Sequence, residues 1–325
     1  MAVKYSVIVP AYKAERTIDV CLTALMSQSV ARDSYEVIVV DDGSPDATAE
    51  IAARYDVKLI RQPNRGPASA RNAGARAASG DIVLFTDSDC EPTPEWIERM
   101  AAPLESDPSV SGVKGAYRTR QRSLTARFAQ VEFMERFDML ARAKNIDMVD
   151  TYSAAFRRAV FEEMRGFDES FPAANNEDTD LSYRLVAAGH RLVFAPDAIV
   201  YHMGHPATPA RYARIKFWRG YWRMVVYRRF PGKAMRDTYT PKALKLQALS
   251  AAGLPFALIC GLMWQPMWYA AAAMIFVLLI TSLPLMLLAL RLDPLIALFT
   301  PFYIGLRALS IGLGATYYLI RGWLS

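Results

Sequence analysis

The stretch Val37-Ile38-Val39-Val40-Asp41-Asp42-Gly43-Ser44 joins four β-branched apolar residues directly to two carboxylates and a turn. Such a uniformly apolar run predicts a strand that is buried on both faces, as in a parallel sheet. The two carboxylates then lie at the carboxyl end of that strand, which is the edge where open α/β sheets bind their ligands. Residues 37–44 therefore predict both a sheet and the position of its binding crevice.

Similar apolar runs alternate with helical patterns through the first two hundred residues. Strands are expected at 5–9, 35–40, 57–60 and 82–86, with helices at 15–28, 47–55 and 68–78. This alternation predicts right-handed crossovers and a parallel, doubly wound sheet. The sequence has neither a Gly-x-Gly-x-x-Gly after the first strand nor a Gly-x-x-x-x-Gly-Lys-Ser/Thr, so dinucleotide-dependent redox chemistry and P-loop NTPase chemistry are disfavoured.

Three further helices are expected beyond residue 110. Residues 123–142 carry apolar side chains at intervals of three and four, which predicts an amphipathic helix. This helix is expected either to pack on the core of the sheet or to form an apolar wall beside an acceptor site. Shorter helices are expected at 158–164 and 178–188, each followed by a glycine.

Positive charge is concentrated in one segment. The composition, 53% hydrophobic and 22% charged, excludes a disordered chain. The net charge is +6, and residues 206–245 alone hold 11 basic residues and 1 acidic residue. Aromatics and arginines alternate there at helical spacing, which suits an amphipathic helix in an anionic headgroup layer. A solvated basic helix is the alternative, and a nucleic-acid groove fits less well because long apolar segments follow directly.

Those apolar segments cover residues 246–264, 267–290 and 295–320. A helix needs about 20 apolar residues to cross a bilayer, so three transmembrane helices are expected. Arg307 lies in the middle of the third segment and must face a partner, a cavity or a lipid phosphate. A re-entrant or interfacial third segment is the alternative.

The predicted organisation follows from these segments. Residues 1–205 form a first domain, residues 206–245 a basic juxtamembrane segment, and residues 246–325 a membrane domain. The first ten residues lack the apolar stretch of a signal peptide, and the basic segment places the start of the first span on the cytoplasmic side. A multi-pass protein of the inner (cytoplasmic) membrane with a cytoplasmic first domain is therefore expected.

Carboxylates also follow the strand expected at 82–86. Asp87 and Asp89 are one residue apart, and such a pair in a crevice can hold a divalent cation that binds a diphosphate. A loop cap is the alternative. Arg71 lies near the start of an expected helix, where amide N–H groups and a guanidinium favour an anion. Asp42 can accept a hydrogen bond from the imide of a base.

Taken together, these motifs resemble the family 2 glycosyltransferases. The resemblance covers residues 4–202 and is carried by Ser6–Tyr12, Val37–Ser44, Gly66–Gly74, Asp87–Asp89 and Glu177–Asp180, in this order. It implies an α/β fold of the GT-A type, in which a Rossmann-like, mostly parallel sheet has flanking helices. Here the amphipathic juxtamembrane helix and the transmembrane helices would follow that domain.

The resemblance also implies roles for the donor-binding residues. Pro10, Tyr12 and Asp42 match positions that line the nucleotide base, and Arg71 matches a position near the base and the phosphates. Asp87 and Asp89 match the Asp-x-Asp motif, in which Asp89 is the principal ligand of Mg²⁺ or Mn²⁺ and Asp87 lies beside the nucleotide and the metal.

Three acidic residues and a histidine complete the site that the resemblance implies. Asp178 matches the catalytic base of an inverting enzyme, and Glu177 and Asp180 flank it as support for the acceptor site. Their charges should raise its proton affinity, and a helix N-cap is the alternative role for Asp178. His202 matches a position that in some members approaches the metal or diphosphate. Its alternative role is to cap a strand end.

The expected activity is sugar transfer at a membrane. A metal-dependent, inverting enzyme would move a sugar from a nucleotide sugar, UDP-linked rather than GDP-linked, to a lipid or lipid-linked saccharide at the cytoplasmic leaflet. Anionic lipids are expected partners and nucleic acid is not. Residues 215–219 do not match the Gln-x-x-Arg-Trp segment of processive synthases, so transfer of one or a few sugars is expected. One alternative is transfer to polyprenyl phosphate, and the other is an inactive nucleotide-binding subunit of an envelope assembly complex.

Overall fold

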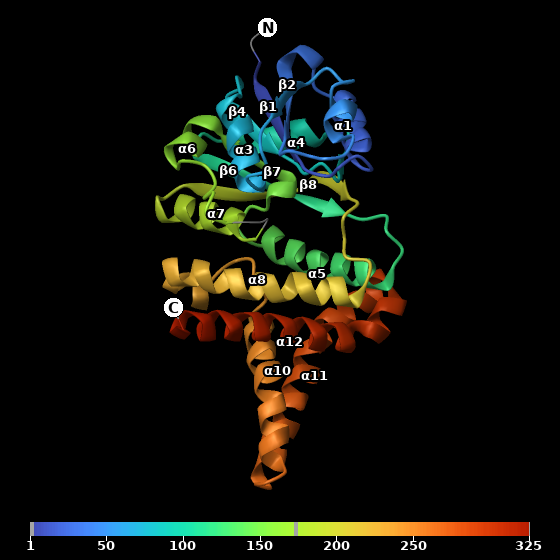
Figure 1. Cartoon of the computed structure of the whole chain (residues 1–325), viewed down its shortest axis with the longest axis vertical. Helices are drawn as coiled ribbons and strands as arrows, with labels where there is room; N and C mark the ends of the chain where they lie inside the picture. The colour runs from blue at the N-terminus through green and yellow to red at the C-terminus, as the bar shows by residue number, and fades with distance from the viewer. Residues whose placement is uncertain (1–2, 172–174, 325) are drawn as a thin grey trace. The chain divides into compact units, whose positions relative to one another are not determined.

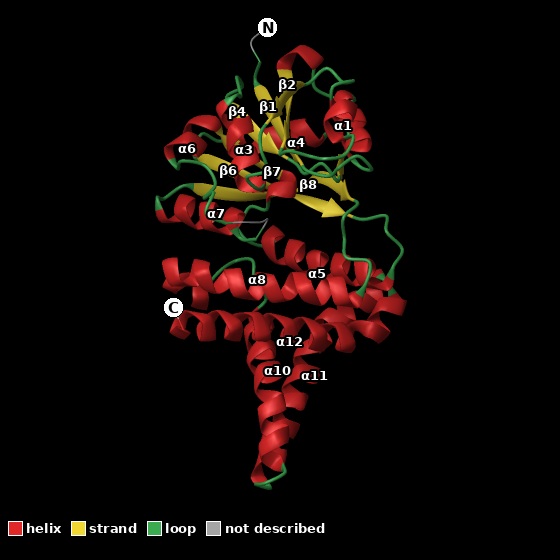
Figure 2. Ribbon diagram, in the orientation of Figure 1, coloured by secondary structure: helices red, strands yellow, loops and turns green. Residues whose placement is uncertain are grey.

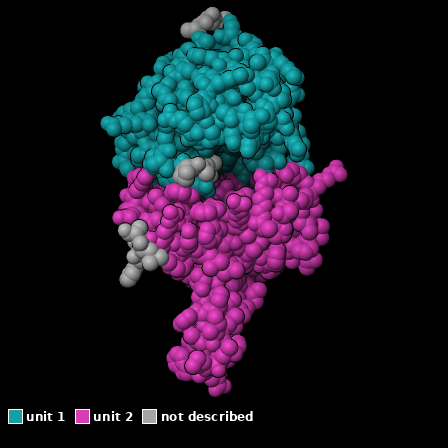
Figure 3. All heavy atoms as spheres, in the orientation of Figure 1, with its two compact units in different colours: residues 1–120, 140–204 teal, residues 121–139, 205–325 magenta. Residues whose placement is uncertain are grey.

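The computed structural model describes residues 3–171 and 175–324. The chain forms two compact units, coloured separately in Figure 3. The first contains residues 1–120 and 140–204, and the second contains residues 121–139 and 205–325. The chain therefore leaves the first unit after residue 120, returns at residue 140, and leaves again after residue 204.

One mixed sheet forms the centre of the first unit (Figure 2). Its eight strands lie in the order β3-β2-β1-β4-β7-β6-β8-β5. Their bounds are Tyr5–Ala11 (β1), Tyr35–Asp41 (β2), Lys58–Arg61 (β3), Ile82–Phe85 (β4), Cys90–Pro92 (β5), Val110–Arg118 (β6), Ala154–Arg157 (β7) and Arg191–His202 (β8).

The parallel part of the sheet confirms the prediction from the apolar runs. β1 lies between β2 and β4 and runs parallel to both, and β3 extends this part beyond β2. Val7, Ile8 and Val9 are completely buried there, as expected for a strand that is covered on both faces. β3 was expected to be buried and is not. It is an edge strand, and both Lys58 and Arg61 are exposed.

The other half of the sheet is partly antiparallel, which the sequence did not indicate. β7 runs antiparallel to its neighbours β4 and β6, while β6 and β8 pair in parallel. β5 then pairs antiparallel with β8 at the edge. The doubly wound prediction therefore describes the first four strands, and the complete sheet is mostly parallel in the manner of a GT-A fold.

Helices cover this sheet, and several match the expected segments. α3 packs on β1 and β2, whereas α4 packs on β6, β7 and β8. The helices of the first unit are α1 (Ile18–Met26), α2 (Thr48–Ala52), α3 (Pro67–Arg76), α4 (Trp96–Ser106), α6 (Arg158–Glu163) and α7 (Glu177–Ala187), with short 3-10 turns at Arg32–Ser34 and Thr151–Ser153.

The second unit is helical. Within it, α10 and α11 form an antiparallel hairpin, and α12 runs along α8 and across that hairpin (Figure 1). Its helices are α5 (Leu124–Ala141, of which residues 124–139 belong to this unit), α8 (Pro209–Arg229), α9 (Pro231–Met235), α10 (Lys242–Gly261), α11 (Pro266–Leu292) and α12 (Pro294–Leu324).

The helix expected at 123–142 exists, but its place differs from the expected one. Most of α5 belongs to the second unit, where Phe128 stacks on Tyr303 at 4.6 Å between ring centroids and packs edge-on against Tyr212. Within the second unit, this part of α5 packs on α8 and α12. The amphipathic pattern shows that a helix has a buried face, but it does not show which partner covers that face.

Three helices are long and apolar enough to cross a membrane. The apolar segments are Ala243–Gly261, Pro266–Leu292 and Pro294–Arg321, close to the predicted spans. They differ in burial within the protein: in an apolar stretch of 18 residues from each segment, 22% and 17% of the residues are buried for the first two segments but 50% for the third. The first two therefore present most of their apolar surface outward, and the third does so on one side.

The basic helix α8 also differs in one detail from the expected arrangement. Its exposed arginines agree with the prediction and include Arg211, Arg214, Arg219, Arg228 and Arg229. Its buried face was expected at Tyr212, Ile215, Trp218, Trp222 and Val225, whereas Tyr212, Lys216, Gly220, Tyr221 and Val226 are buried. The face is rotated because Lys216 pairs with a buried carboxylate, Glu132 of α5.

Candidate active site

Arg71 joins two of the sequence motifs. It lies in the first half of α3 and its side chain is only 3% exposed. One guanidinium nitrogen donates to Asp87 Oδ1 at 2.8 Å and the other to Glu177 Oε1 at 2.9 Å. The buried guanidinium of Arg71 thereby brings the carboxyl end of β4 and the amino end of α7 together in the first unit.

Asp87 and Asp89 lie in the turn between β4 and β5. The Cys90 N–H donates to the Asp87 carbonyl at 3.0 Å, which closes this turn. Asp87 and Asp89 have side chains that are 28% and 34% exposed, so both remain accessible to a ligand. Of these two carboxylates, Asp87 is the one held by Arg71.

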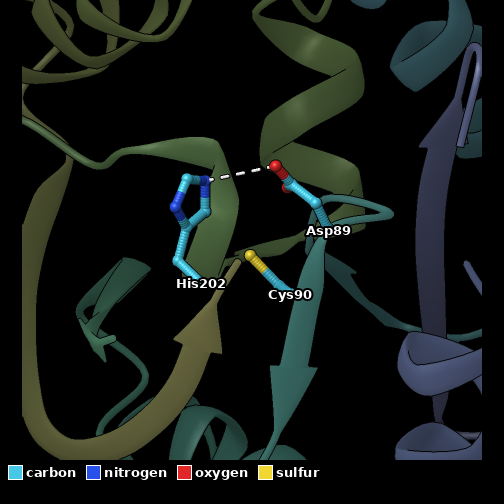
Figure 4. A group of neighbouring side chains, drawn as sticks. All are labelled: Asp89, Cys90 and His202. Atoms are coloured by element: carbon cyan, nitrogen blue, oxygen red, sulfur yellow. Dashed lines mark ion pairs between the residues drawn. The ribbon is translucent and has the colours of Figure 1, made fainter. Parts of the chain in front are cut away.

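Asp89 is instead near His202, as Figure 4 shows. His202 ends β8, and its Nε2 lies 3.6 Å from Asp89 Oδ2. The Cys90 thiol completes a group whose donor atoms all lie within 4.8 Å of one another. Burial raises the pKa of the Cys90 thiol well above its usual value, and the nearby carboxylates add to this. A raised pKa favours the neutral thiol at Cys90.

Glu177 and Asp178 form the first turn of α7. Asn176 precedes them in the left-handed conformation, with φ 67°, and is the N-cap residue. The alternative role of Asp178 as N-cap is therefore wrong. Its Oδ1 accepts a hydrogen bond from the Thr179 N–H at 2.6 Å. Asp180 pairs with Arg184 one turn later, at 2.8 Å.

The carboxylates of α7 have altered proton affinities. Burial raises the pKa of Asp178 to about 7, and the charges of Glu177 and Asp150 add to the increase. Burial also raises the pKa of Glu177, against the opposing effect of Arg71. The expected direction for Asp178 agrees with this result, but burial is the main cause. The second charge comes from Asp150, since Asp180 is paired with Arg184.

The residues expected around the base lie at the ends of β1 and β2. Pro10 is buried within β1, and Tyr12, just beyond that strand, is 45% exposed. Asp42 is 3% exposed and accepts hydrogen bonds from the Gln62 amide and from the Arg65 and Gly66 N–H groups. The Asp42 carboxylate therefore holds residues 62–66 in place at this edge of the sheet.

Comparisons with known proteins agree with this arrangement. Residues 6–165 match the family Glycosyl transferase family 2. Glycosyltransferase AglE from Haloferax volcanii is 30% identical over 207 residues, which cover 62% of this chain and 67% of AglE. The chain belongs to glycosyltransferase family 2. Several other curated relatives are matched over about half of their own length or less.

Solved structures of other glycosyltransferases share the fold. The mannosyltransferase PcManGT from Pyrobaculum calidifontis, in complex with GDP-Man and Mn²⁺, has a TM-score of 0.58 and 23% identity over 98% of this chain and 88% of that one. TarS 1–349 from S. aureus, in complex with UDP, has a TM-score of 0.50 and 20% identity over 98% and 92% of the two chains. The GT-A architecture is therefore established for this family 2 glycosyltransferase.

Three residues of the site were missed in the sequence. Lys114 of β6 is completely buried and forms an ion pair with Asp150. Tyr152 donates to the same Asp150 oxygen at 2.9 Å and accepts from Lys114 at 2.7 Å. Asp150 in turn raises the pKa of Asp178. The only signal was a lysine inside an apolar strand, which requires a counter-charge but does not identify it.

The donor atoms beside the Asp-x-Asp turn suit a divalent metal. Asp89 supplies a carboxylate, which suits Mg²⁺ and Mn²⁺, and His202 adds an imidazole, a common ligand of divalent transition metals. Gly204 brings the backbone so close that a Cβ there would collide with Asp89 Oδ2. The carboxylate is therefore held between His202 and a glycine, and the residues present fit the metal that this family 2 enzyme would use.

Proposed function

We propose that this protein is a membrane-anchored, metal-dependent, inverting glycosyltransferase. It transfers a sugar from a nucleotide sugar to a lipid or lipid-linked saccharide at the cytoplasmic leaflet. The observation that carries this proposal is the position of Arg71 between Asp87 and Glu177, which joins the donor motif to the acidic motif. Family membership supports the reaction class.

Each residue of the site has a role in this reaction. Asp178 removes the proton of the acceptor hydroxyl as that oxygen attacks the anomeric carbon from the face opposite the diphosphate. A pKa of about 7 suits a base that must take up a proton near neutral pH. Arg71 offsets the charge that develops on the leaving diphosphate. Asp89 and His202 would hold Mg²⁺ or Mn²⁺, which when bound supplies further positive charge to the same diphosphate.

The donor is a nucleoside diphosphate sugar whose base lies against Pro10, Tyr12 and Asp42. We favour a UDP-linked sugar over a GDP-linked one. The fold neighbours include one enzyme solved with GDP-Man and Mn²⁺ and another solved with UDP, so both donor classes occur on this architecture. A binding comparison of UDP and GDP decides between them.

The second unit supports an acceptor that lies at the membrane. Three apolar helices are long enough to cross a bilayer, and the exposed arginines of α8 precede them. Such a basic helix binds an anionic lipid surface, and the positive-inside rule places it in the cytoplasm. This arrangement supports the proposal of an inner-membrane enzyme with a cytoplasmic catalytic unit.

Transfer to polyprenyl phosphate is the second candidate. The exposed arginines of α8 favour it because guanidinium groups bind phosphate. Arg307 does not favour it, since its NH1 and NH2 groups already bind Glu132 and Gln247. An inactive subunit is disfavoured because Arg71, Asp87 and Glu177 form one connected group.

The test measures nucleotide release by the purified full-length protein. A panel of UDP- and GDP-sugars is incubated with Mn²⁺, Mg²⁺ or a chelator, with lipid extract, polyprenyl phosphate or no lipid. Metal-dependent release that needs lipid extract supports the proposal, and mass spectrometry identifies the product. Release that only polyprenyl phosphate stimulates supports the second candidate. No release under any condition supports the inactive subunit.

A further inference from the structure

The arrangement of α12 conflicts with a span across the membrane. Arg307 lies near the middle of α12 and is 2% exposed. It donates to Glu132 Oε1 of α5 at 2.8 Å. The other oxygen of Glu132 accepts from Tyr212 at 2.7 Å and from Lys216 at 2.9 Å, both in α8. Glu132 itself is completely buried, so this group of charges ties α12 to α5 and α8.

The same arginine extends the network to the hairpin. Arg307 donates to Gln247 Oε1 of α10 at 2.7 Å, and the Gln247 amide donates to Thr281 of α11 at 3.1 Å. One connected set of buried polar groups thus joins α5, α8, α10, α11 and α12. Such a network defines a specific arrangement of helices because each buried group needs its partners.

Close contacts with α8 continue toward the end of α12. A Cβ at Gly314 would collide with the Phe217 carbonyl, and one at Gly220 would collide with the Ile311 carbonyl. Tyr221 then packs edge-on against Tyr318, with ring centroids 5.4 Å apart. α12 therefore follows α8 through at least three helical turns, as Figure 1 also shows.

α8 cannot enter the hydrocarbon of a bilayer. Its exposed side chains include five arginines, at positions 211, 214, 219, 228 and 229. Arginines on the lipid-facing side of a helix are strongly disfavoured in hydrocarbon. Because α12 lies along α8 and shares its buried charges, α12 must remain at the depth of α8. The hairpin is not restricted in this way, since the charged residues of α11 are confined to its final turn, at Arg291.

The free side of α12 is apolar and continuous. Seven of its exposed large side chains are spaced by three, four or seven residues and therefore share one face: Leu295, Leu298, Phe302, Leu309, Leu313, Tyr317 and Ile320. Leu319 is exposed beside this face. This stripe lies on a helix that crosses the hairpin, whose own apolar surface requires lipid. A helix with one apolar face and one face on charged partners suits the boundary between headgroups and acyl chains.

We propose that, of the three candidate spans, α10 and α11 cross the bilayer while α12 lies flat in its surface, with the apolar stripe against the acyl chains. This inference rests on the membrane anchoring under the proposed function. With two crossings, the end of α12 is on the same side of the membrane as α8. With three, it would be on the opposite side.

Single cysteines test the number of crossings in the full-length protein. Cys260 is replaced by serine, and Cys21 and Cys90 are buried. One cysteine is then placed at Arg236, Gln265 or Arg321, all exposed. A membrane-impermeant maleimide is added to spheroplasts before and after permeabilisation. Arg321→Cys is expected to label like Arg236→Cys, and opposite to Gln265→Cys.

The outcomes separate the two proposals. If Arg321→Cys labels like Gln265→Cys while alkaline carbonate leaves the protein in the membrane, α12 crosses and this inference alone is overturned. If carbonate extracts the protein, the anchoring itself fails and the inference fails with it. If carbonate leaves the protein in the membrane and Arg321→Cys labels like Arg236→Cys, the result supports both the membrane anchoring and the position of α12 in the bilayer surface.

Spin labels measure the depth of α12 independently. Nitroxides at Leu298, Leu309 and Ile320, along the stripe, are compared in lipid nanodiscs with one at Leu279, in the middle of α11. We expect three equal, shallow depths on α12 and a deep position on α11. A deep position at Leu309 between two shallow ones would indicate a crossing helix. Labels that neither oxygen nor a water-soluble relaxant reaches would indicate cover by a second copy, which also overturns the proposal.

Discussion

Each unit of this enzyme contains a buried arginine that binds two other side chains. Arg71 belongs to the candidate active site, whereas Arg307 joins helices of the second unit. Arg71 and Arg307 are 3% and 2% exposed. Arg71 holds Asp87, whose side chain is 28% exposed, whereas Arg307 holds Glu132 and Gln247, which are 0% and 1% exposed. The other partner of Arg71, Glu177, is 2% exposed, so a ligand can reach one of the two partners of Arg71 but neither partner of Arg307. What distinguishes a binding site from a purely structural ion pair here is an exposed partner of the arginine. The burial of the arginine itself is similar in both.

The largest effect is expected at Asp178, beside the Arg71 group. Asp178→Asn removes the general base, so turnover should fall by about 10²- to 10⁴-fold while donor binding is retained. Turnover and nucleotide affinity are measured separately on the purified variant. Asp138→Asn, at an exposed position of α5, is the control and should leave turnover unchanged. Unchanged turnover in Asp178→Asn would remove the assignment of the base.

The same variant should become more stable. Because the pKa of Asp178 in the folded protein, about 7, lies above the ordinary value of 3.8, the folded state binds the proton more tightly than the unfolded chain. Ionisation therefore lowers the stability of the folded protein as pH rises from about 4 to about 7. Asp178→Asn should raise the thermal midpoint at pH 8 and have little effect at pH 4. A lower midpoint at pH 8 would contradict the raised pKa.

The matching test in the second unit is Glu132→Gln. It leaves Lys216 and Arg307 buried without their counter-charge, and breaking a buried ion pair typically costs about 3–5 kcal/mol. We expect a lower unfolding midpoint in detergent, with unchanged nucleotide affinity in the protein that remains folded. Asp138→Asn on the same helix serves as the control. A loss of nucleotide affinity without a loss of stability would make Glu132 part of the binding site and would end the comparison drawn above.

The fold was predictable where a strand is uniformly apolar. β1, β2 and β4 are such runs, and their order follows from the crossover rule. β6 escaped detection because Gly112, Lys114 and Gly115 interrupt it, and α4 because Pro103 lies inside it. β7 has only four residues and runs antiparallel to its neighbours, which no local pattern indicates.

The site was predictable where its residues follow a strand end, and less so where partners are distant. Asp87 and Asp89 follow β4 directly, so their position indicated a ligand edge. Lys114 and Asp150 are 36 positions apart, and Glu132 and Arg307 are 175 positions apart. A buried charge in a sequence shows that a counter-charge exists, but only the folded chain identifies it. For Arg307 the sequence left three alternatives open, a partner, a cavity or a lipid phosphate, and the structure shows partners, Glu132 and Gln247.

A smaller effect is expected from Arg71→Met, the counterpart of Glu132→Gln in the first unit. The NH1 and NH2 groups of Arg71 already bind Glu177 and Asp87, so we expect Arg71 to act on the diphosphate through its positive charge. A unit charge near the diphosphate contributes on the order of 1–3 kcal/mol at the effective dielectric of a protein, so its loss should weaken nucleotide binding by about 10- to 100-fold. Calorimetry with UDP and Mn²⁺ measures this loss. Arg307→Met is the matched control, with lower stability and unchanged affinity. Equal affinity for Arg71→Met and the unmodified protein would show that Arg71 is structural too.

The smallest effect is expected where the backbone supports a ligand of the metal. A Cβ at Gly204 would collide with Asp89 Oδ2, so Gly204→Ala should displace that carboxylate from its position beside His202. Changes next to metal ligands typically cost about 10- to 100-fold in metal affinity, and we expect the lower end of this range because the Asp89 side chain can rotate away from the added methyl group. Titration of Mn²⁺, followed by its paramagnetic resonance signal, reports this loss without any turnover. Gly232→Ala is the control, since a Cβ there meets nothing within 4 Å. Because the Arg71 group does not include Asp89, Gly204→Ala should leave nucleotide affinity in the absence of metal unchanged. A fall in that affinity would mean that the two carboxylates of the turn act as one unit.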